Sequence, residues 1–292
     1  MAGNSTDGIA AAAQLAKASD VVVLCVGVDD TQEREGLDRV ITTLPGVQTQ
    51  LVDAVLEANA NVVVVLFNGG AMTLGPIKER AKAIVDAFYG GEMGSQALAD
   101  VIFGEYNPSG KLAATMYPLN KSGQLDAQPL TEMSVTKAPG RTHMFYTGEP
   151  EFAFGTGLSY TSWEMEWSPS SKNGQTLTPG GKTVNVEVAL TNAGEIEGRQ
   201  TLLFFWRPTT ATVSPTASDD FVPLKRKLIG YAGTGSFVQP GETRTLSVAV
   251  SHEDFALAHG ESNGKAVVAP GGYELFVVDG AGGEVMTTVT LA

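Results

Sequence analysis

The stretch Val21-Val-Val-Leu-Cys-Val-Gly-Val28 decides the fold of the first half of the chain. This run is almost entirely apolar, too short for an ordinary helix and rich in β-branched residues. Such a run is typical of a strand that is buried on both faces of a parallel sheet. Cys25 lies in its middle and is therefore expected in the core. The run from Asn61 to Phe67 repeats the pattern and predicts a second buried strand.

Helical patterns alternate with these apolar runs. Helices are expected over residues 8–19, 45–59, 76–82 and 95–103, and a third strand over residues 83–89. In the helix over 45–59, Pro45 suits the first turn, and Val52, Val55 and Leu56 recur at helical spacing. Strands that alternate with helices imply crossover connections. The predicted class is therefore α/β, with a mostly parallel sheet in an α/β/α sandwich.

The second half has an all-β pattern. Its expected strands are bounded by Pro-Gly, Asn-Gly and Gly-Gly turn signals and cover residues 159–167, 182–192, 198–207, 225–236, 242–250, 271–279 and 284–291. Short strands at this spacing predict a β-sandwich of immunoglobulin or fibronectin type. Few apolar runs occur just before it. The predicted organisation is an α/β domain over 1–118, a connector over 119–157 and a β-sandwich over 158–292.

Composition narrows the class of protein. A length of 292 residues suggests two domains, at roughly 150 residues each. The 32 acidic and 19 basic residues give a net charge of −13, which argues against nucleic acids and anionic membranes as partners. No apolar run approaches the roughly 18 residues that a membrane span needs. One cysteine and three histidines exclude a disulfide framework and argue against structural zinc. The first residues do not read as a signal peptide.

Three loops follow the expected strands, at the edge where open parallel sheets bind ligands: residues 29–44, 68–75 and 90–94. The first is unusually long for such a connection and combines acidic side chains with arginines. A solvated surface loop is the simpler interpretation. The functional interpretation is that arginines orient carboxylates, one of which acts as a general acid. The charged residues of this loop are Asp29, Asp30, Glu33, Arg34, Glu35, Asp38 and Arg39.

Other candidate sites have less support. The glycine pairs at 69–70 and 90–91 either let a ligand approach the backbone or serve as plain turns. Neither G-x-G-x-x-G nor a Walker A pattern is present, which weakens a phosphate-binding interpretation. No G-x-S-x-G elbow occurs, and the histidines lie outside the sheet loops. We expect His143, His252 and His259 to be surface or structural residues. We expect Trp163, Trp167 and Trp206 in the core, with a sugar platform as the alternative.

The motifs resemble glycoside hydrolase family 3, in its β-xylosidase and β-glucosidase branches. The resemblance begins with Glu33-Arg-Glu-Gly-Leu-Asp-Arg39, followed by Leu44-Pro-Gly-Val-Gln48. Further matching motifs follow in order at residues 67–70, 89–94, 99–111, 139–142, 145–148 and 154–161. The motifs at 139–142 and 145–148 favour the β-xylosidase subgroup. The second half resembles the fibronectin type III-like domain that ends many of these enzymes.

The resemblance implies a retaining mechanism, in which two carboxylates work about 5–5.5 Å apart. It implies that the acid/base is Glu35, which directly precedes Gly36, with Glu33 as the second candidate. Arg39, Asp38, Asn68 and Gly69 are then expected to bind the substrate, and Asp38 and Arg39 to serve as orienting or structural partners. In the family the nucleophile is an aspartate on an N-terminal barrel. This sequence matches neither that barrel nor an early strand of the α/β domain.

The expected function is therefore that of the C-terminal portion of a retaining exo-acting β-glycosidase. It would act on terminal β-linked xylose or glucose of oligosaccharides, with no metal or organic cofactor. Its expected partners are the oligosaccharide and the missing barrel domain, without which the chain is expected to be inactive. The alternatives are a non-catalytic carbohydrate-binding or domain-docking protein and, from the fold class alone, a nucleotide-binding protein. Family members are commonly secreted, and the sequence leaves the compartment open.

Overall fold

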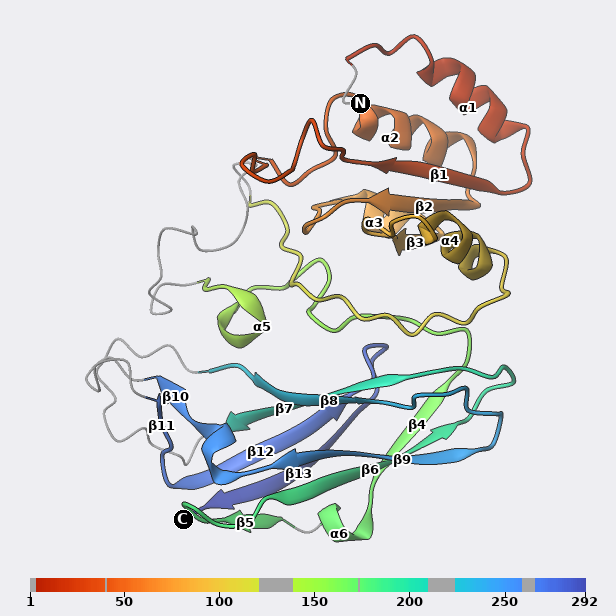
Figure 1. The fold of residues 1–292 in the computed structure, drawn as a ribbon. Helices are drawn as coiled ribbons and strands as arrows, with labels where there is room; N and C mark the ends of the chain where they lie inside the picture. Colours follow the sequence, from red (N-terminus) through yellow and green to blue (C-terminus); the bar gives the residue numbers. More distant parts are fainter. Residues whose placement is uncertain (1–3, 40, 121–138, 173, 210–223, 259–265) are drawn as a thin grey trace. The chain divides into compact units, whose positions relative to one another are not determined.

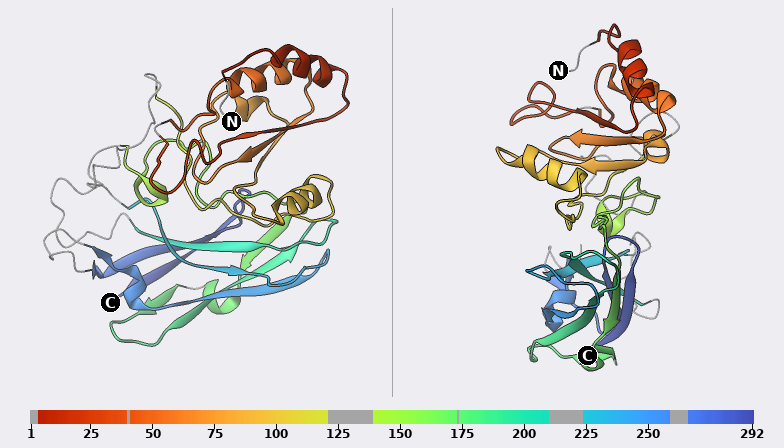
Figure 2. Two further views of the ribbon diagram at one scale, coloured as in Figure 1. Left: turned by 45° about the horizontal axis from the view of Figure 1, so that its top comes forward. Right: turned by 90° about the vertical axis from the view of Figure 1, so that its right-hand side faces the viewer.

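The computed structural model describes residues 4–39, 41–120, 139–172, 174–209, 224–258 and 266–292. They fall into two compact units (Figures 1 and 2). The first unit holds the described residues within Met1–Glu105, Ala114–Asp126 and Gly148–Ala153. The second holds those within Tyr106–Ala113, Ala127–Thr147 and Phe154–Ala292. The domain limits at 118 and 158 stay a prediction, and much of the expected connector lies outside the described residues.

A three-stranded parallel sheet forms the centre of the first unit (Figure 1). Its order is β1-β2-β3, with Val22 opposite Val62 and Val63 opposite Ala83. Helices connect the parallel strands, as crossover geometry requires, so the predicted α/β class is confirmed. The elements are α1 (Ile9–Lys17), β1 (Val22–Gly27), α2 (Gln48–Ala58), β2 (Val62–Phe67), α3 (Ile77–Arg80), β3 (Ala83–Asp86) and α4 (Gly94–Ile102).

Helices α1 and α2 share a buried apolar cluster with the sheet. Ala16 of α1, Val52 of α2 and Val64 of β2 belong to it, each with 2% exposure or less. Helix α2 begins at Gln48, three residues later than the sequence predicts. Gly46 has a φ of +58°, a left-handed conformation that a right-handed helix does not accommodate.

Two predictions for the first strand are wrong. The strand expected to be buried on both faces has one open face, and Cys25 is exposed rather than in the core. Burial alternates along β1 because Leu24 and Val26 pack toward the helices, whereas Val23 on the opposite face is 43% exposed. In the described part of the sheet, β1 is a border strand, so an apolar sequence alone does not bury it.

The second unit is a β-sandwich made of a three-stranded sheet, β4-β6-β9, and a five-stranded sheet, β5-β13-β12-β7-β8. Neighbouring strands are antiparallel except β5 and β13. The strands are β4 (Trp163–Trp167), β5 (Gln175–Leu177), β6 (Val184–Asn192), β7 (Thr201–Pro208), β8 (Lys227–Gly233), β9 (Thr243–Val250), β12 (Gly271–Val278) and β13 (Glu284–Leu291). The smaller elements are α5 (Thr142–Phe145), α6 (Pro169–Lys172), η1 (His252–Phe255) and the pair β10 (Leu257–Ala258) and β11 (Ala266–Val267).

Large apolar side chains from both sheets form the sandwich core. Leu190 of β6 and Leu246 of β9 pack with Phe204 of β7, which is fully buried. Trp206 is also fully buried, as predicted for a core residue. Trp163 and Trp167 are partly buried and pack against the same core. The similarity of this sandwich to the fibronectin type III fold stays a prediction.

Candidate active site at the carboxyl edge of the parallel sheet

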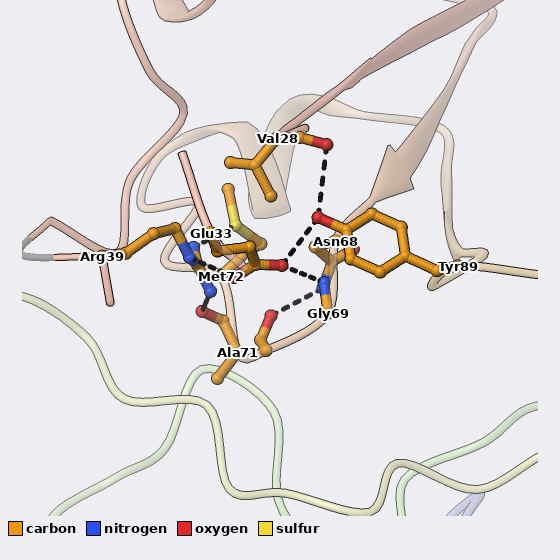
Figure 3. Close-up of polar contacts among 9 residues, drawn as sticks. Val28, Glu33, Arg39, Asn68, Gly69, Ala71, Met72 and Tyr89 are labelled. Carbon is orange, nitrogen blue, oxygen red and sulfur yellow. Dashed lines mark hydrogen bonds and ion pairs between the residues drawn. The ribbon is translucent and has the colours of Figure 1, made fainter. Parts of the chain in front are cut away.

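The loops that follow β1, β2 and β3 meet at one carboxylate, that of Glu33 (Figure 3). Glu33 lies in the loop after β1, and its Oε1 accepts one hydrogen bond from each of the other two loops. The backbone N–H of Gly69, after β2, donates one of them. The hydroxyl of Tyr89, after β3, donates the other over 2.8 Å. The carboxyl ends of parallel strands lie at the same edge of a sheet, which explains how residues so distant in sequence converge.

Arg39 holds the other side of the same carboxylate. Its Nε donates to Glu33 Oε2 over 2.6 Å, and both side chains are largely buried, at 11% and 17% exposure. Its Nη2 donates to the carbonyl of Ala71 over 3.0 Å, and Nη1 lies 2.8 Å from the sulfur of Met72. The guanidinium therefore joins the loop after β1 to the loop after β2.

These contacts keep Glu33 in its charged form. Burial alone would raise the pKa of this carboxyl, but the hydrogen bonds from Tyr89 and Gly69 and the charge of Arg39 outweigh it, so the pKa is lowered. The hydrogen bond between Tyr89 and Glu33 has the opposite effect on the pKa of Tyr89. Burial and the adjacent carboxylate raise the pKa of Tyr89 to about 12, so its hydroxyl remains a donor.

The loop after β2 is shaped to receive this carboxylate. A Cβ on Gly69 would lie 2.7 Å from Glu33 Oε1 and 2.9 Å from the Tyr89 ring, so a side chain there would displace the cluster. Asn68 is fully buried, and its Nδ2 donates to the carbonyl of Gly70 over 2.7 Å. Asn68 thus contacts its own loop, and the Gly69 amide contacts Glu33.

Glu35 has a different environment from Glu33. It is exposed, at the tip of a turn in which the backbone groups of Arg34 and Leu37 exchange hydrogen bonds of 3.1 and 2.9 Å. The next residue, Gly36, has a φ of +77°, which glycine adopts readily. Asp38 is also exposed. Of the predicted site residues, the structure therefore brings together Glu33, Arg39 and the loop 68–69, and leaves Glu35 and Asp38 at the surface.

Sequence reasoning missed Tyr89, which completes the cluster. Its signal was its position, at the end of the third predicted strand and directly before the glycine pair at 90–91. It also missed Met72 and the carbonyl of Ala71, whose roles depend on the path of the loop.

The remaining candidates do not join this cluster. His143 and His252 belong to the second unit, and His259 lies outside the described residues. No three metal-ligating side chains come close enough to bind a metal ion within the ranges that the structure describes. No described helix combines the length and the apolar character needed to cross a membrane.

The family model for the glycosyl hydrolase family 3 C-terminal domain matches residues 2–160. An exo-1,4-beta-xylosidase of Emericella nidulans is 33% identical, over 93% of this chain and 35% of its own length. A probable exo-1,4-beta-xylosidase of Aspergillus fumigatus is 31% identical, with the same coverage. The chain thus spans about a third of the length of the curated relatives it matches.

Solved structures show the same similarity over both units. A GH3 exo-beta-xylosidase in complex with a xylobiose aziridine probe has a TM-score of 0.84 and is 29% identical, over 99% of this chain and 38% of that one. A GH3 beta-glucosidase of Bifidobacterium adolescentis has a TM-score of 0.77 and is 28% identical, over 98% of this chain and 41% of that one.

Proposed function

The chain belongs to glycosyl hydrolase family 3, and from that premise we propose that it carries the general acid/base of a retaining exo-acting β-glycosidase. We assign this role to Glu35. The substrate we propose is an oligosaccharide with a terminal β-linked sugar, xylose in the first place, because several of the similar curated proteins are described as exo-1,4-beta-xylosidases.

The assignment rests on one observation: the neighbours of Glu33 hold its carboxyl in the charged form. An acid/base residue donates a proton and later takes one back, so both protonation states must be accessible. Glu33 accepts hydrogen bonds from Gly69, Tyr89 and Arg39, all of which favour the carboxylate. These contacts suit a residue that anchors a loop. Glu35, two residues further on, is the exposed glutamate of that loop.

The anchored loop also explains how an exposed residue can be positioned. Arg39 and Glu33 fix the loop on both sides of the turn that carries Glu35. A turn between two fixed points restricts where the Glu35 carboxylate can lie, and positioning of this kind reduces the entropic cost of proton transfer. Arg39 and Glu33 are therefore proposed to act by positioning, as are Asn68 and Gly69. Asp38 adjoins Arg39 and is proposed to lie at the substrate side.

The test compares two substrates and two variants. This chain is mixed with the part of the Emericella nidulans relative that it does not match, and hydrolysis of xylobiose and of 2,4-dinitrophenyl β-xyloside is measured. Protonation matters for the sugar leaving group of xylobiose and little for dinitrophenolate. Glu35→Gln should therefore reduce kcat/KM for xylobiose by roughly 10²–10⁴-fold and affect kcat/KM for the aryl substrate far less, because kcat/KM reports the first step, in which the leaving group departs.

Glu33→Gln is the matched control, since it makes the same chemical change two residues away. It should reduce activity on both substrates by similar factors, because it disturbs the loop rather than the proton transfer. Activity that survives Glu35→Gln unchanged on xylobiose would show that the assignment is wrong. Xylobiose binding without turnover in every mixture would favour the alternative, a non-catalytic carbohydrate-binding protein.

A further inference from the structure

Asp86, the last residue of β3, contacts both of the loops that supply neutral donors to Glu33. It stands opposite Leu66 of β2, and opposite residues of neighbouring strands direct their side chains to the same face of a sheet. Asn68 follows Leu66 by two residues, and side chains at this spacing in an extended chain share a face. The Asn68 side chain is accordingly near enough to the Asp86 carboxyl to lower its pKa by hydrogen bonding.

A turn that begins at Asp86 sets the direction of Tyr89. Asp86 Oδ1 accepts a hydrogen bond of 3.3 Å from the N–H of Phe88, two residues further on. This is the contact of an Asx turn, in which a short side chain takes the place of a backbone carbonyl. Phe88 has a φ of +48°, in the left-handed region that bulky residues rarely adopt, and such a conformation persists only where its surroundings hold it. The next residue is Tyr89, whose hydroxyl donates to Glu33 over 2.8 Å.

The other oxygen of Asp86 belongs to a pair of buried acceptors. Asp86 Oδ2 and Asn68 Oδ1 are both buried, and among the described residues neither has a hydrogen-bond partner. Buried acceptors without donors are unfavourable, and a proton on Asp86 Oδ2 makes that atom a donor for which Asn68 Oδ1 is the open acceptor. Burial raises the pKa of Asp86, and the contacts with Phe88 and Asn68 oppose this only in part. Asp86 therefore takes up a proton more readily than an ordinary aspartate.

We propose that Asp86 is a positioning residue of the site, which fixes the turn before Tyr89 through Oδ1 and the loop of Asn68 through Oδ2. It thereby places both neutral donors to Glu33, the Tyr89 hydroxyl and the Gly69 N–H (Figure 3). Asn68 transmits the second effect, because its Nδ2 donates to the carbonyl of Gly70 and so closes the loop around the Gly69 amide. Asp86 acts through these neighbours and takes no part in proton transfer.

The test measures the two donors directly in the chain as it is. The inference rests on the proposed function for its purpose, since Glu33 anchors the loop of Glu35, but the test needs no glycosidase activity and its failure leaves the role of Glu35 open. The Tyr89 ring is followed by NMR of tyrosine-labelled protein up to pH 11, with Tyr89→Phe to assign its signal, and exchange of the Gly69 amide is timed near neutral pH. The methyl signals of Val64, fully buried in the same unit, verify at each pH that the chain is folded.

Asp86→Ala and Asp86→Asn should differ sharply. Burial and the Glu33 carboxylate raise the pKa of Tyr89 to about 12, so its signal in the unchanged chain should barely titrate by pH 11. Asp86→Ala should move this pKa toward the ordinary 10.0 and speed exchange of the Gly69 amide about tenfold, as expected for the loss of one hydrogen bond. Asp86→Asn keeps the acceptor for Phe88 and offers an N–H to Asn68 Oδ1, as the protonated carboxyl does. Both readouts should therefore stay at the values of the unchanged chain.

Two further variants complete the test. Asp86→Ser keeps an oxygen that can form the turn but none that reaches Asn68, so the Gly69 amide should exchange faster while Tyr89 keeps its raised pKa. Asp20→Ala is the matched control, since Asp20 is exposed before β1 at the opposite edge of the same sheet, and neither readout should change. Unchanged readouts in both Asp86→Ala and Asp86→Ser would overturn the proposal. So would a Gly69 amide that exchanges as fast in Asp86→Asn as in those two variants.

Discussion

In the first unit a largely buried carboxylate is kept charged by its neighbours, whereas in the second unit two partly buried bases are shifted toward their neutral forms. Glu33 has three donors directed at it, and its pKa is lowered. Burial lowers the pKa of Lys111 to about 8, with partial compensation from Asp279. Burial and the charge of Arg226 lower the pKa of His143 to about 4.

The difference lies in what surrounds each group. Lys111 Nζ donates to the carbonyl of Gly157 over 3.1 Å, and His143 stacks on Phe154 with ring centroids 4.3 Å apart. A carbonyl and an aromatic ring stabilise a cation much less than a full set of charged and dipolar partners would. The carboxylate of Glu33 thus has polar partners that stabilise its charge, whereas Lys111 and His143 have few.

The largest effect is expected from the apolar core of the second unit. Phe204→Ala removes a fully buried ring between the two sheets and should lower the free energy of unfolding of that unit by about 3–5 kcal/mol. Trp163, Trp167 and Trp206 all belong to this unit, so urea unfolding followed by tryptophan fluorescence reports it. Tyr231→Ala, at an exposed position of β8, is the control and should change this free energy by less than about 0.5 kcal/mol.

The next largest effect on the free energy of unfolding is expected when Glu33 loses its charge. Glu33→Gln leaves the guanidinium of Arg39 largely buried without its carboxylate, at a cost of about 2–3 kcal/mol to the first unit. The exchange rate of the Gly69 amide should rise, because its acceptor weakens. Glu35→Gln changes the same group at an exposed turn and should cost less than about 0.5 kcal/mol. Equal losses in the two variants would contradict the distinction between anchor and acid/base.

That distinction marks the limit of what sequence alone could predict. Alternating apolar runs and turn residues were enough to predict the class and the main strands of both halves. They did not separate Glu33 from Glu35, because two glutamates with one residue between them have equivalent local patterns. The structure separates them through Tyr89 and Gly69, which approach from other loops.

The exposed face of β1 was missed for a related reason. A run such as residues 21–28 shows that a strand is apolar, but whether a layer covers it depends on segments far away in the sequence. Strand β5 (Gln175–Leu177) was missed because three residues are too few to show an alternating pattern. Local patterns therefore predicted the elements, and long-range neighbours determined burial.

A smaller effect is expected when pH rises past the pKa of Lys111. Its pKa is lowered from 10.5 to about 8 in the folded chain, so folding favours the neutral amine. The second unit should therefore gain stability as pH rises from about 8 to 10.5, by about 1 kcal/mol once solvent screening is included. Lys111→Met should flatten this part of the profile, as measured by urea unfolding at a series of pH values. If the stability gain persists in Lys111→Met, another titrating group is responsible for it.

The smallest effect is a difference between the two units in how their stability changes at mildly acidic pH. The pKa of His143 is lowered from 6.5 to about 4, so the neutral ring is favoured by folding. Its contribution is fully present above pH 6.5 and is lost as pH falls toward 4. The contribution of Glu33, whose pKa is lowered from 4.5, persists through most of that range. Between pH 6.5 and 4.5 the second unit should therefore weaken, by less than about 1 kcal/mol, while the Gly69 amide stays protected. His143→Phe keeps a ring against Phe154 and should remove this loss, and an unchanged loss in that variant would place the acid sensitivity elsewhere in the second unit.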